Sequence, residues 1–187
     1  MSLEECLQKI DALHSNDPKK VDGKAAELVY AERMTGWLNK LVDSPSEELQ
    51  IAVRSQHLCR WEIPRSDYPM DRPGYFKWRT NLGKLHAEKA AECMAESGYN
   101  EETINRTKSI IRKQNLKNDS DAQTMEDCAC LVFIENDFLP FASKYDEAKV
   151  IDIVQKTWAK MSEKGHQAAL ALDLPEEALE VIKKALS

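Results

Sequence analysis

Residues 54–79 read RSQHLCRWEIPRSDYPMDRPGYFKWR and lie between two stretches with helical periodicity. One helix is predicted over residues 45–60 and another over residues 75–97, each with start or stop signals at its ends. Three prolines exclude a continuous helix over residues 61–73, and no alternation of apolar and polar residues indicates a strand there. The segment therefore predicts a long ordered loop that joins two helices.

Helical periodicity also dominates the rest of the chain. Further helices are predicted at 2–14, 23–42, 100–114, 120–136, 146–163 and 176–186, with a loop at 137–143. A chain of 187 residues, of which 42% are hydrophobic, is long enough to bury one good core. We therefore predict an all-α fold: a single compact domain of about eight helices over residues 1–187, with a core at about 5–170 and a C-terminal helix at about 176–186.

The composition indicates which cellular compartment and which kinds of partner to expect. The five cysteines lack the regular spacing of a disulfide framework, and the first residues lack a basic, then apolar, signal segment. No apolar segment approaches the roughly 20 residues that span a bilayer. We expect a reduced, cytoplasmic protein without a membrane partner. The sequence is compatible with a homo-oligomer but carries no signal for one.

The opening segment concentrates positive charge and aromatic rings in an acidic chain. Residues 54–86 hold seven Arg and Lys residues against three Asp and Glu residues, although the formal net charge of the chain is −6. Arginine stacks on aromatic rings and presents a fork that suits phosphate or carboxylate. We predict a site for a small anion, with these binding residues: Arg54, Arg60, Trp61, Arg65, Arg72 and Arg79. Alternatively, the arginines pair with acidic side chains and hold the loop in place.

Two of the four histidines stand close to these arginines in the sequence. His57 is predicted to share a helix face with Arg54 and Arg60, and His86 lies inside the next helix. Alternatively, either histidine is a buried core residue whose ring nitrogens have hydrogen-bond partners. The other two are expected to be exposed: His14 and His166.

Asp127 is the other candidate ligand. It stands in the sequence MEDCACLVF, in one of the most apolar helices, and an aspartate is almost never fully buried without a partner. If His57, His86 and Asp127 converge, they form a site of nitrogen and oxygen ligands for one divalent metal, Mn, Fe or Zn. Cys128 and Cys130 point in nearly opposite directions on a helix, so they are predicted to be core residues.

Three long motifs carry a resemblance to a protein family. They are QHLCRWEIPRSDYPMDRPGYFKWR, LHAEKAAECMAESGY and EDCACLVFIE. With these motifs the chain resembles, over about residues 5–170, the uncharacterised family called domain of unknown function 4202. That resemblance implies no activity.

A second resemblance is to the HD superfamily of metal-dependent phosphohydrolases, which are all-helical. The order of candidate ligands along the chain is similar: Glu32 or Glu27, then His57, His86, Glu126 and Asp127. This resemblance implies an HD-like helix order, a bound metal and hydrolysis of a phosphate ester. The chain departs from the superfamily at Leu58, which follows His57 where the superfamily carries an aspartate.

Two hypotheses for the function remain. In the first, the protein hydrolyses a small phosphate-containing substrate, such as a nucleotide: the metal activates water, Glu32 and Glu126 act as ligand or general base, and the arginines hold the phosphate. In the second, the same residues form a polar network without catalysis that binds a small anion or an RNA end.

Overall fold

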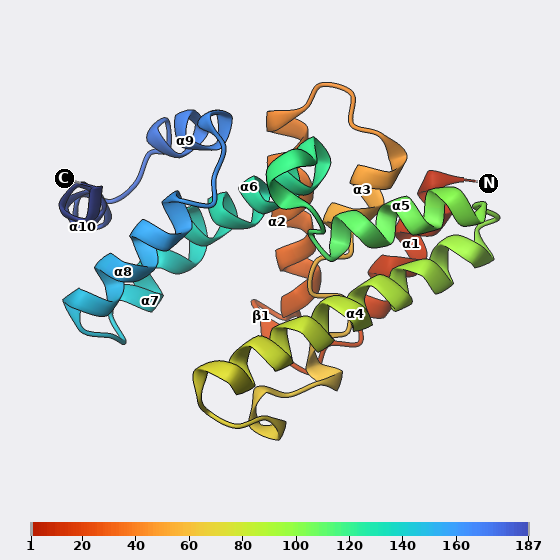
Figure 1. Ribbon diagram of the computed structural model, residues 1–187, viewed down its shortest axis with the longest axis horizontal. Helices are drawn as coiled ribbons and strands as arrows, with labels where there is room; N and C mark the ends of the chain where they lie inside the picture. The colour runs from red at the N-terminus through yellow and green to blue at the C-terminus, as the bar shows by residue number, and fades with distance from the viewer. Residues whose placement is uncertain (1, 187) are drawn as a thin grey trace. The chain divides into compact units, whose positions relative to one another are not determined.

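The computed structural model describes residues 2–186, which are almost entirely helical (Figure 1). The helices in this range are α1 (Leu3–His14), α2 (Ala26–Leu41), α3 (Glu47–Arg54), α4 (Arg72–Glu96), α5 (Glu101–Ile111), α6 (Ser120–Val132), α7 (Phe138–Ala142), α8 (Glu147–Trp158), α9 (Glu163–Leu170) and α10 (Glu176–Leu186). The predicted all-α class is confirmed, with slightly more helices than expected. None of the helices described is long and apolar enough to cross a membrane.

The chain divides into two compact units, which are described separately below. Unit 1 comprises Met1–Met125 and unit 2 comprises Glu126–Ser187. All five cysteines are free and buried, and the predicted burial of Cys128 and Cys130 is confirmed. Three of these thiols belong to unit 1 and two to unit 2.

A short hairpin, which the sequence did not predict, precedes α2. Strands β1 (Lys20–Val21) and β2 (Lys24–Ala25) pair antiparallel. The two residues between them, Asp22 and Gly23, have φ values of 50° and 80°. Positive φ at both central positions is the geometry of the turns that match the twist of paired strands, and Asp-Gly is a favoured sequence for it.

Helix α3 ends at Arg54, six residues before its predicted end at Arg60. The chain then makes a tight turn in which His57 and Cys59 adopt left-handed backbone conformations, with φ values of 66° and 56°. These conformations are incompatible with a continuing helix. The prediction that His57 and Arg60 share one helix face with Arg54 is therefore wrong.

Side chains from other helices explain this early end. The carbonyl oxygen of Arg54 lies 2.9 Å from Nε2 of His14, and the carbonyl oxygen of Leu58 lies 2.7 Å from Nδ1 of His86. Carbonyl groups past a helix end need such partners, and here two imidazoles supply them. His14 is consequently fully buried, so its predicted exposure is wrong.

The predicted loop at 61–73 is confirmed as an ordered connection. It contains two single 3-10 turns, η1 (Arg60–Glu62) and η2 (Arg65–Asp67). The Arg65 guanidinium donates hydrogen bonds of 3.0 Å and 2.7 Å to the carbonyl oxygens of Tyr68 and Pro69. Arg65, predicted to bind substrate, thus holds the loop, as the structural alternative expects.

In unit 1, α5 packs against both α3 and α4, α2 packs on α3, and α1 contacts both α3 and α4. The side chain of Asp71 caps α4 and that of Asn100 caps α5, as expected for residues that supply an oxygen to a helix start. The largest fully buried apolar side chains of this unit are Ile10, Met34, Leu38, Ile51, Leu58, Leu82, Met94, Ile110 and Met125.

Unit 2 differs from the prediction at residues 137–143, which were expected to form a loop. A π-helical turn, η4 (Phe133–Asp137), leads directly into α7. The ring of Phe133 packs edge-on against those of Phe138 and Phe141, at centroid distances of 6.2 Å and 5.7 Å. Aromatic packing of this kind stabilises the helical path. Pro140 is tolerated because it lies in the first turn of α7, where no intrahelical N–H is needed.

Helices α8 and α10 complete unit 2 by packing on each other. Gln155 Nε2 donates a 2.9 Å hydrogen bond to the carbonyl oxygen of Ala185, and Lys184 pairs with Glu147. The buried core between these helices consists of Phe138, Val150, Val154, Ala178 and Ala185.

Candidate functional site

His57 and His86, both predicted as site residues, lie close together in unit 1. Their ring centroids are 6.1 Å apart. His86 comes from the middle of α4, whereas His57 comes from the turn after α3 and has the left-handed backbone described above. A non-glycine residue in that region costs about 1–3 kcal/mol, and such strain is concentrated at functional sites.

The His57 ring is held by three neighbours. Its plane stacks on Tyr30 at a centroid distance of 4.3 Å, Nδ1 lies 3.2 Å from Oε2 of Glu27, and Arg60 Nη1 lies 2.9 Å from Nε2. Since guanidinium only donates, Nε2 accepts and Nδ1 carries the proton shared with Glu27. Burial, followed by the charges of Arg60 and Arg79, lowers the pKa of His57 well below 6.5, so the ring is neutral.

Glu27, and not Glu32, is the carboxylate at His57. The side chain of Asp17 accepts a 2.9 Å hydrogen bond from the Glu27 backbone N–H and so fixes the first turn of α2. Burial raises the pKa of the Glu27 carboxyl to about 7, although the positive charge of Arg60 acts against this rise. Glu32 points to the surface and pairs with Lys24 at 2.5 Å. Of the two glutamates that the sequence left open, Glu27 is therefore the one in contact with a histidine.

His86 presents a neutral imidazole to the same region. Its Nδ1 donates to the carbonyl oxygen of Leu58, which leaves Nε2 as the accepting nitrogen. Burial is the largest cause that lowers the pKa of His86, to about 3, and the neighbouring His57 contributes.

A cavity of about 250 Å³ in unit 1 opens onto both imidazoles. Its lining consists of Gln56, His57, Phe76, Arg79, Thr80, Leu82, Gly83, His86, Ile111, Arg112 and Lys113. Of the predicted arginines, Arg79 lines it. Arg112 and Lys113 also line it and were missed, because a cationic pair at the end of a helix is most simply explained as a partner of the negative end of the helix dipole. The cavity is thus positively charged, and no carboxylate is found among the described residues that line it.

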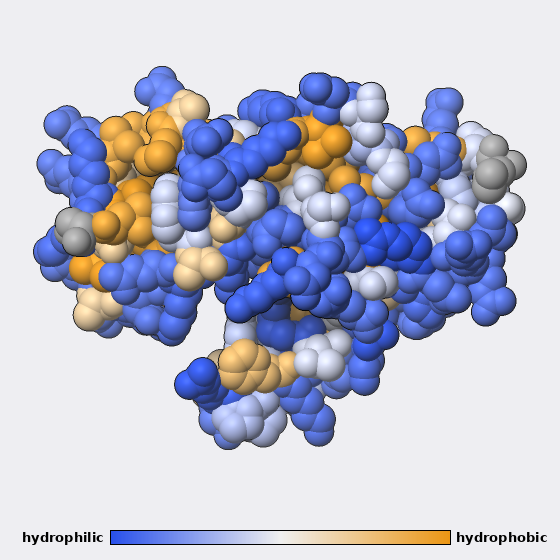
Figure 2. Space-filling view, turned by 45° about the horizontal axis from the view of Figure 1, so that its top comes forward, coloured by the Kyte–Doolittle hydropathy of each residue, from blue (hydrophilic) through white to orange (hydrophobic). Residues whose placement is uncertain are grey.

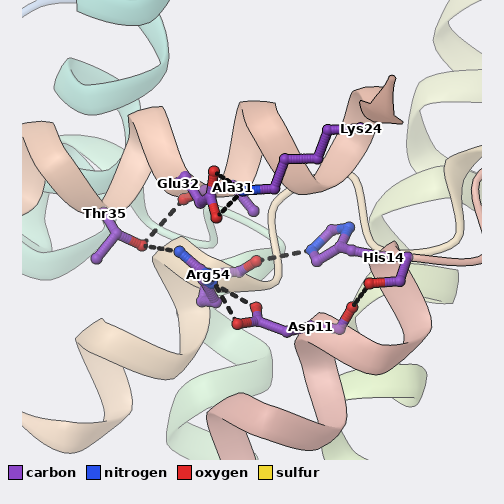
Figure 3. A network of polar contacts seen from close by, with 8 residues as sticks. Asp11, His14, Lys24, Ala31, Glu32, Thr35 and Arg54 are labelled. Atoms are coloured by element: carbon purple, nitrogen blue, oxygen red, sulfur yellow. Dashed lines mark hydrogen bonds and ion pairs between the residues drawn. The ribbon is translucent and has the colours of Figure 1, made fainter. Parts of the chain in front are cut away.

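Arg54, predicted to bind substrate, instead joins three helices (Figure 3). Its guanidinium donates to both carboxylate oxygens of Asp11, at 2.6 Å and 2.8 Å, and to Thr35 Oγ1 at 3.2 Å. Asp11 lies on α1, Thr35 on α2 and Arg54 at the end of α3. A paired, largely buried arginine of this kind fixes helix positions.

The other predicted binding residues lie on the loop and the first turns of α4. Arg60 lies over the ring of Trp78 at 5.1 Å, and Arg72 lies over Phe76 at 5.5 Å. Trp61 is half-buried in η1. These contacts are cation–π interactions, which leave the guanidinium edges able to bind an anion.

Asp127 and Glu126 lie in unit 2, whereas the two histidines lie in unit 1. Asp127 accepts hydrogen bonds from the backbone N–H and the hydroxyl of Ser162, the residue that caps α9. A Cβ at Gly165 would lie 2.8 Å from Asp127 Oδ1, so the carboxylate approaches the α9 backbone closely. Glu126 lies 3.8 Å from Lys160 Nζ. Among residues 2–186 no group of three or more His, Cys, Asp and Glu side chains is arranged to hold a metal, and the metal set stays a prediction.

Comparison with known proteins identifies a family and no more. Neither the curated proteins nor the solved structures contain a match to the chain. Residues 4–182 match the family described as Domain of unknown function (DUF4202). This match covers nearly the whole chain, and the chain therefore belongs to that family.

Proposed function

We propose that unit 1 binds a small phosphate-containing molecule in the cavity at His57 and His86, and hydrolyses it. The observation that carries this proposal is the lining itself: two neutral imidazoles with Arg79, Arg112 and Lys113. Cationic side chains around a concave site favour phosphate, and neutral imidazoles there are able to donate, accept or take up a proton.

The aromatic rim supports a nucleotide as the ligand. Phe76 lines the cavity and is 54% exposed, with Arg72 beside its ring. An exposed ring next to arginine is a stacking surface for a base. The phosphate then lies toward Arg79 and Arg112, and the base lies on Phe76.

In the proposed reaction, His57 and Glu27 supply the acid–base chemistry. Arg60 is largely buried, and burial lowers its pKa. In the proposed reaction, the negative charge of the incoming phosphate attracts the Arg60 guanidinium away from Nε2 of His57. The freed Nε2 accepts a proton from the attacking water while Glu27 stabilises the imidazolium through Nδ1. The water oxygen forms a bond to phosphorus, the ester P–O bond breaks, and the leaving oxygen takes a proton from solvent.

The metal-assisted form of the reaction is less well supported by the contacts. A divalent cation bound at His57 would need Nε2, which now faces the Arg60 guanidinium. The third predicted ligand, Asp127, accepts two hydrogen bonds from Ser162. We therefore propose the reaction without a metal and keep Mn²⁺ addition as one arm of the test.

The test is a panel of nucleoside phosphates and p-nitrophenyl phosphate, assayed on the full chain with and without Mn²⁺. We expect turnover that Glu27→Gln lowers about a hundredfold, as for loss of a general base partner. Glu32→Gln is the matched control on the same helix and should be unchanged. Equal activity in both variants, or turnover only with Mn²⁺, would overturn the metal-free assignment.

The alternative is a noncatalytic anion or RNA-end site, which the contacts of Arg65 with loop carbonyls favour. It predicts saturable binding of a nucleotide without turnover. Arg79→Gln should then weaken binding, and Lys77→Gln, which changes an exposed residue of the same helix outside the cavity, should not.

A further inference from the structure

Unit 2 holds a second cavity, of a different chemical kind. Its volume is about 200 Å³. The lining consists of Phe133, Ile134, Phe138, Val154, Thr157, Trp158, Ala169, Leu170, Leu174, Leu179, Ile182 and Lys183. Figure 2 shows hydrophobic side chains gathered on the surface of this unit. Apolar cavities of about 150 Å³ stay free of water and take up apolar molecules, so this cavity is suited to an apolar ligand.

One wall of the cavity is built by unusual backbone. Phe133 and Ile134 belong to the π-helical turn Phe133–Asp137. Such turns are rare, and they occur often at functional sites. The rare backbone conformation and the apolar lining are therefore two independent indications of a binding site.

Another lining residue, Trp158, is in contact with a histidine. The ring of His166 stacks on Trp158 at a centroid distance of 4.1 Å and an angle of 8°, and its Nε2 lies 2.8 Å from the Trp158 carbonyl oxygen. The indole that lines the cavity is therefore fixed in one orientation. Leu170 is 72% exposed and lies at the cavity edge, where it offers an apolar entrance.

Charge defines the ligand further. Within the described part of the chain, Lys183 is the one charged side chain in the lining, and it is exposed to solvent. The neighbouring residue Lys184 pairs with Glu147 and does not line the cavity. A ligand that matches this arrangement has an apolar chain for the cavity and one negative head group for Lys183.

We propose that unit 2 binds a medium-chain aliphatic carboxylate. The alkyl chain lies among Phe138, Val154 and Ile182, and the carboxylate pairs with the Lys183 ammonium group. This site is separate from the phosphate site proposed in unit 1.

The test is titration of the full chain with decanoate, below the concentration at which it forms micelles, followed by calorimetry and thermal unfolding. We expect saturable binding, a rise in the unfolding temperature and methyl NMR shifts confined to residues that line the cavity, among them Val154, Leu174 and Ile182. Lys183→Met should weaken decanoate binding about tenfold and leave decanol binding unchanged. Lys164→Met, an exposed lysine of α9 outside the lining, is the matched control.

A second variant tests the cavity directly. Ala169→Phe adds a ring that fills part of the cavity and should abolish binding of both decanoate and decanol, with the unfolding temperature of the free protein retained or raised, as for cavity-filling substitutions. Three results would overturn the proposal: no saturable binding, equal losses in the Lys183 and Lys164 variants, or a dimer that Leu170→Glu abolishes and decanoate does not dissociate. The last result would assign the surface to a second copy of the chain.

Discussion

Nδ1 of His57 lies 3.2 Å from Oε2 of Glu27, so a neutral imidazole and a carboxyl with a pKa of about 7 share one proton-bearing contact inside unit 1. Burial shifts the pKa values of the two groups in opposite directions, and both shifts favour the neutral form. Burial raises the pKa of Glu27, because the charged carboxylate is disfavoured, and lowers that of His57, because the charged imidazolium is disfavoured.

The first prediction concerns the stability of Glu27→Gln against pH. The folded chain binds the Glu27 proton more tightly than the unfolded chain, whose carboxyl titrates near 4.5. The wild type therefore loses stability as pH rises from about 4.5 to about 7, whereas the glutamine variant keeps a neutral side chain. The variant should gain about 3 kcal/mol relative to wild type over this window, as measured by urea unfolding at each pH. The same trend in Glu32→Gln would contradict this.

The second prediction concerns proton uptake on anion binding. Both imidazoles are neutral in the free protein, and a bound anion favours their charged forms. Sulfate, whose own charge is constant between pH 5 and 8, should therefore bind more tightly as pH falls. Calorimetry in two buffers of different ionisation enthalpy measures the proton uptake directly. His86→Gln should reduce the uptake, and a pH-independent affinity in the wild type would refute the proposed site.

The third prediction distinguishes a structural Arg54 from a binding one. Arg54→Gln leaves the carboxylate of Asp11 without its bidentate partner and should cost about 2–3 kcal/mol of unfolding free energy. Lys9→Gln, which removes an exposed pair with Glu96, should cost under about 1 kcal/mol. Nucleotide affinity should be unchanged in both variants under conditions where they are folded. Weaker binding by the Arg54 variant alone would restore it as a ligand contact.

The fourth prediction tests the contact between Asp127 and α9. Gly165→Ala places a methyl group against the Asp127 carboxylate and should destabilise unit 2 by about 1–3 kcal/mol. Gly36→Ala is the matched control, because a Cβ there meets nothing within 4 Å and alanine favours a helix by up to about 1 kcal/mol. Thermal unfolding compares the two, and a neutral Gly165 variant would show that the Asp127 contact is loose.

Local signals in the sequence predicted the helices well. The cap at Asn100 and the prolines of the 61–73 loop act through neighbours a few residues away, so their effects can be read without tertiary structure. Helix α9 was missed because it has a single cap at Ser162 and few apolar residues to mark a periodic face.

The candidate site was harder to predict, because its geometry depends on distant side chains. The imidazole of His14 on α1 binds the last carbonyl group of α3, and that of His86 on α4 binds the Leu58 carbonyl in the following turn. A helical projection therefore placed Arg54 beside His57 incorrectly. The choice between Glu27 and Glu32 depends on how α2 is rotated against the core. The sequence raised the convergence of His57, His86 and Asp127 only as a condition for a metal site, and the structure places the ring centroids of the two histidines 6.1 Å apart.

The reactivity of the buried cysteines measures how often the helices around them separate. Burial raises the pKa of the Cys6 and Cys59 thiols to about 12, and it also raises that of Cys93. Because the thiolate is the form that reacts, alkylating reagents reach these sulfurs only when the surrounding helices separate. Cys128 and Cys130 provide the same measurement in unit 2, so mass spectrometry of labelled peptides can time the opening of each unit without any engineered probe.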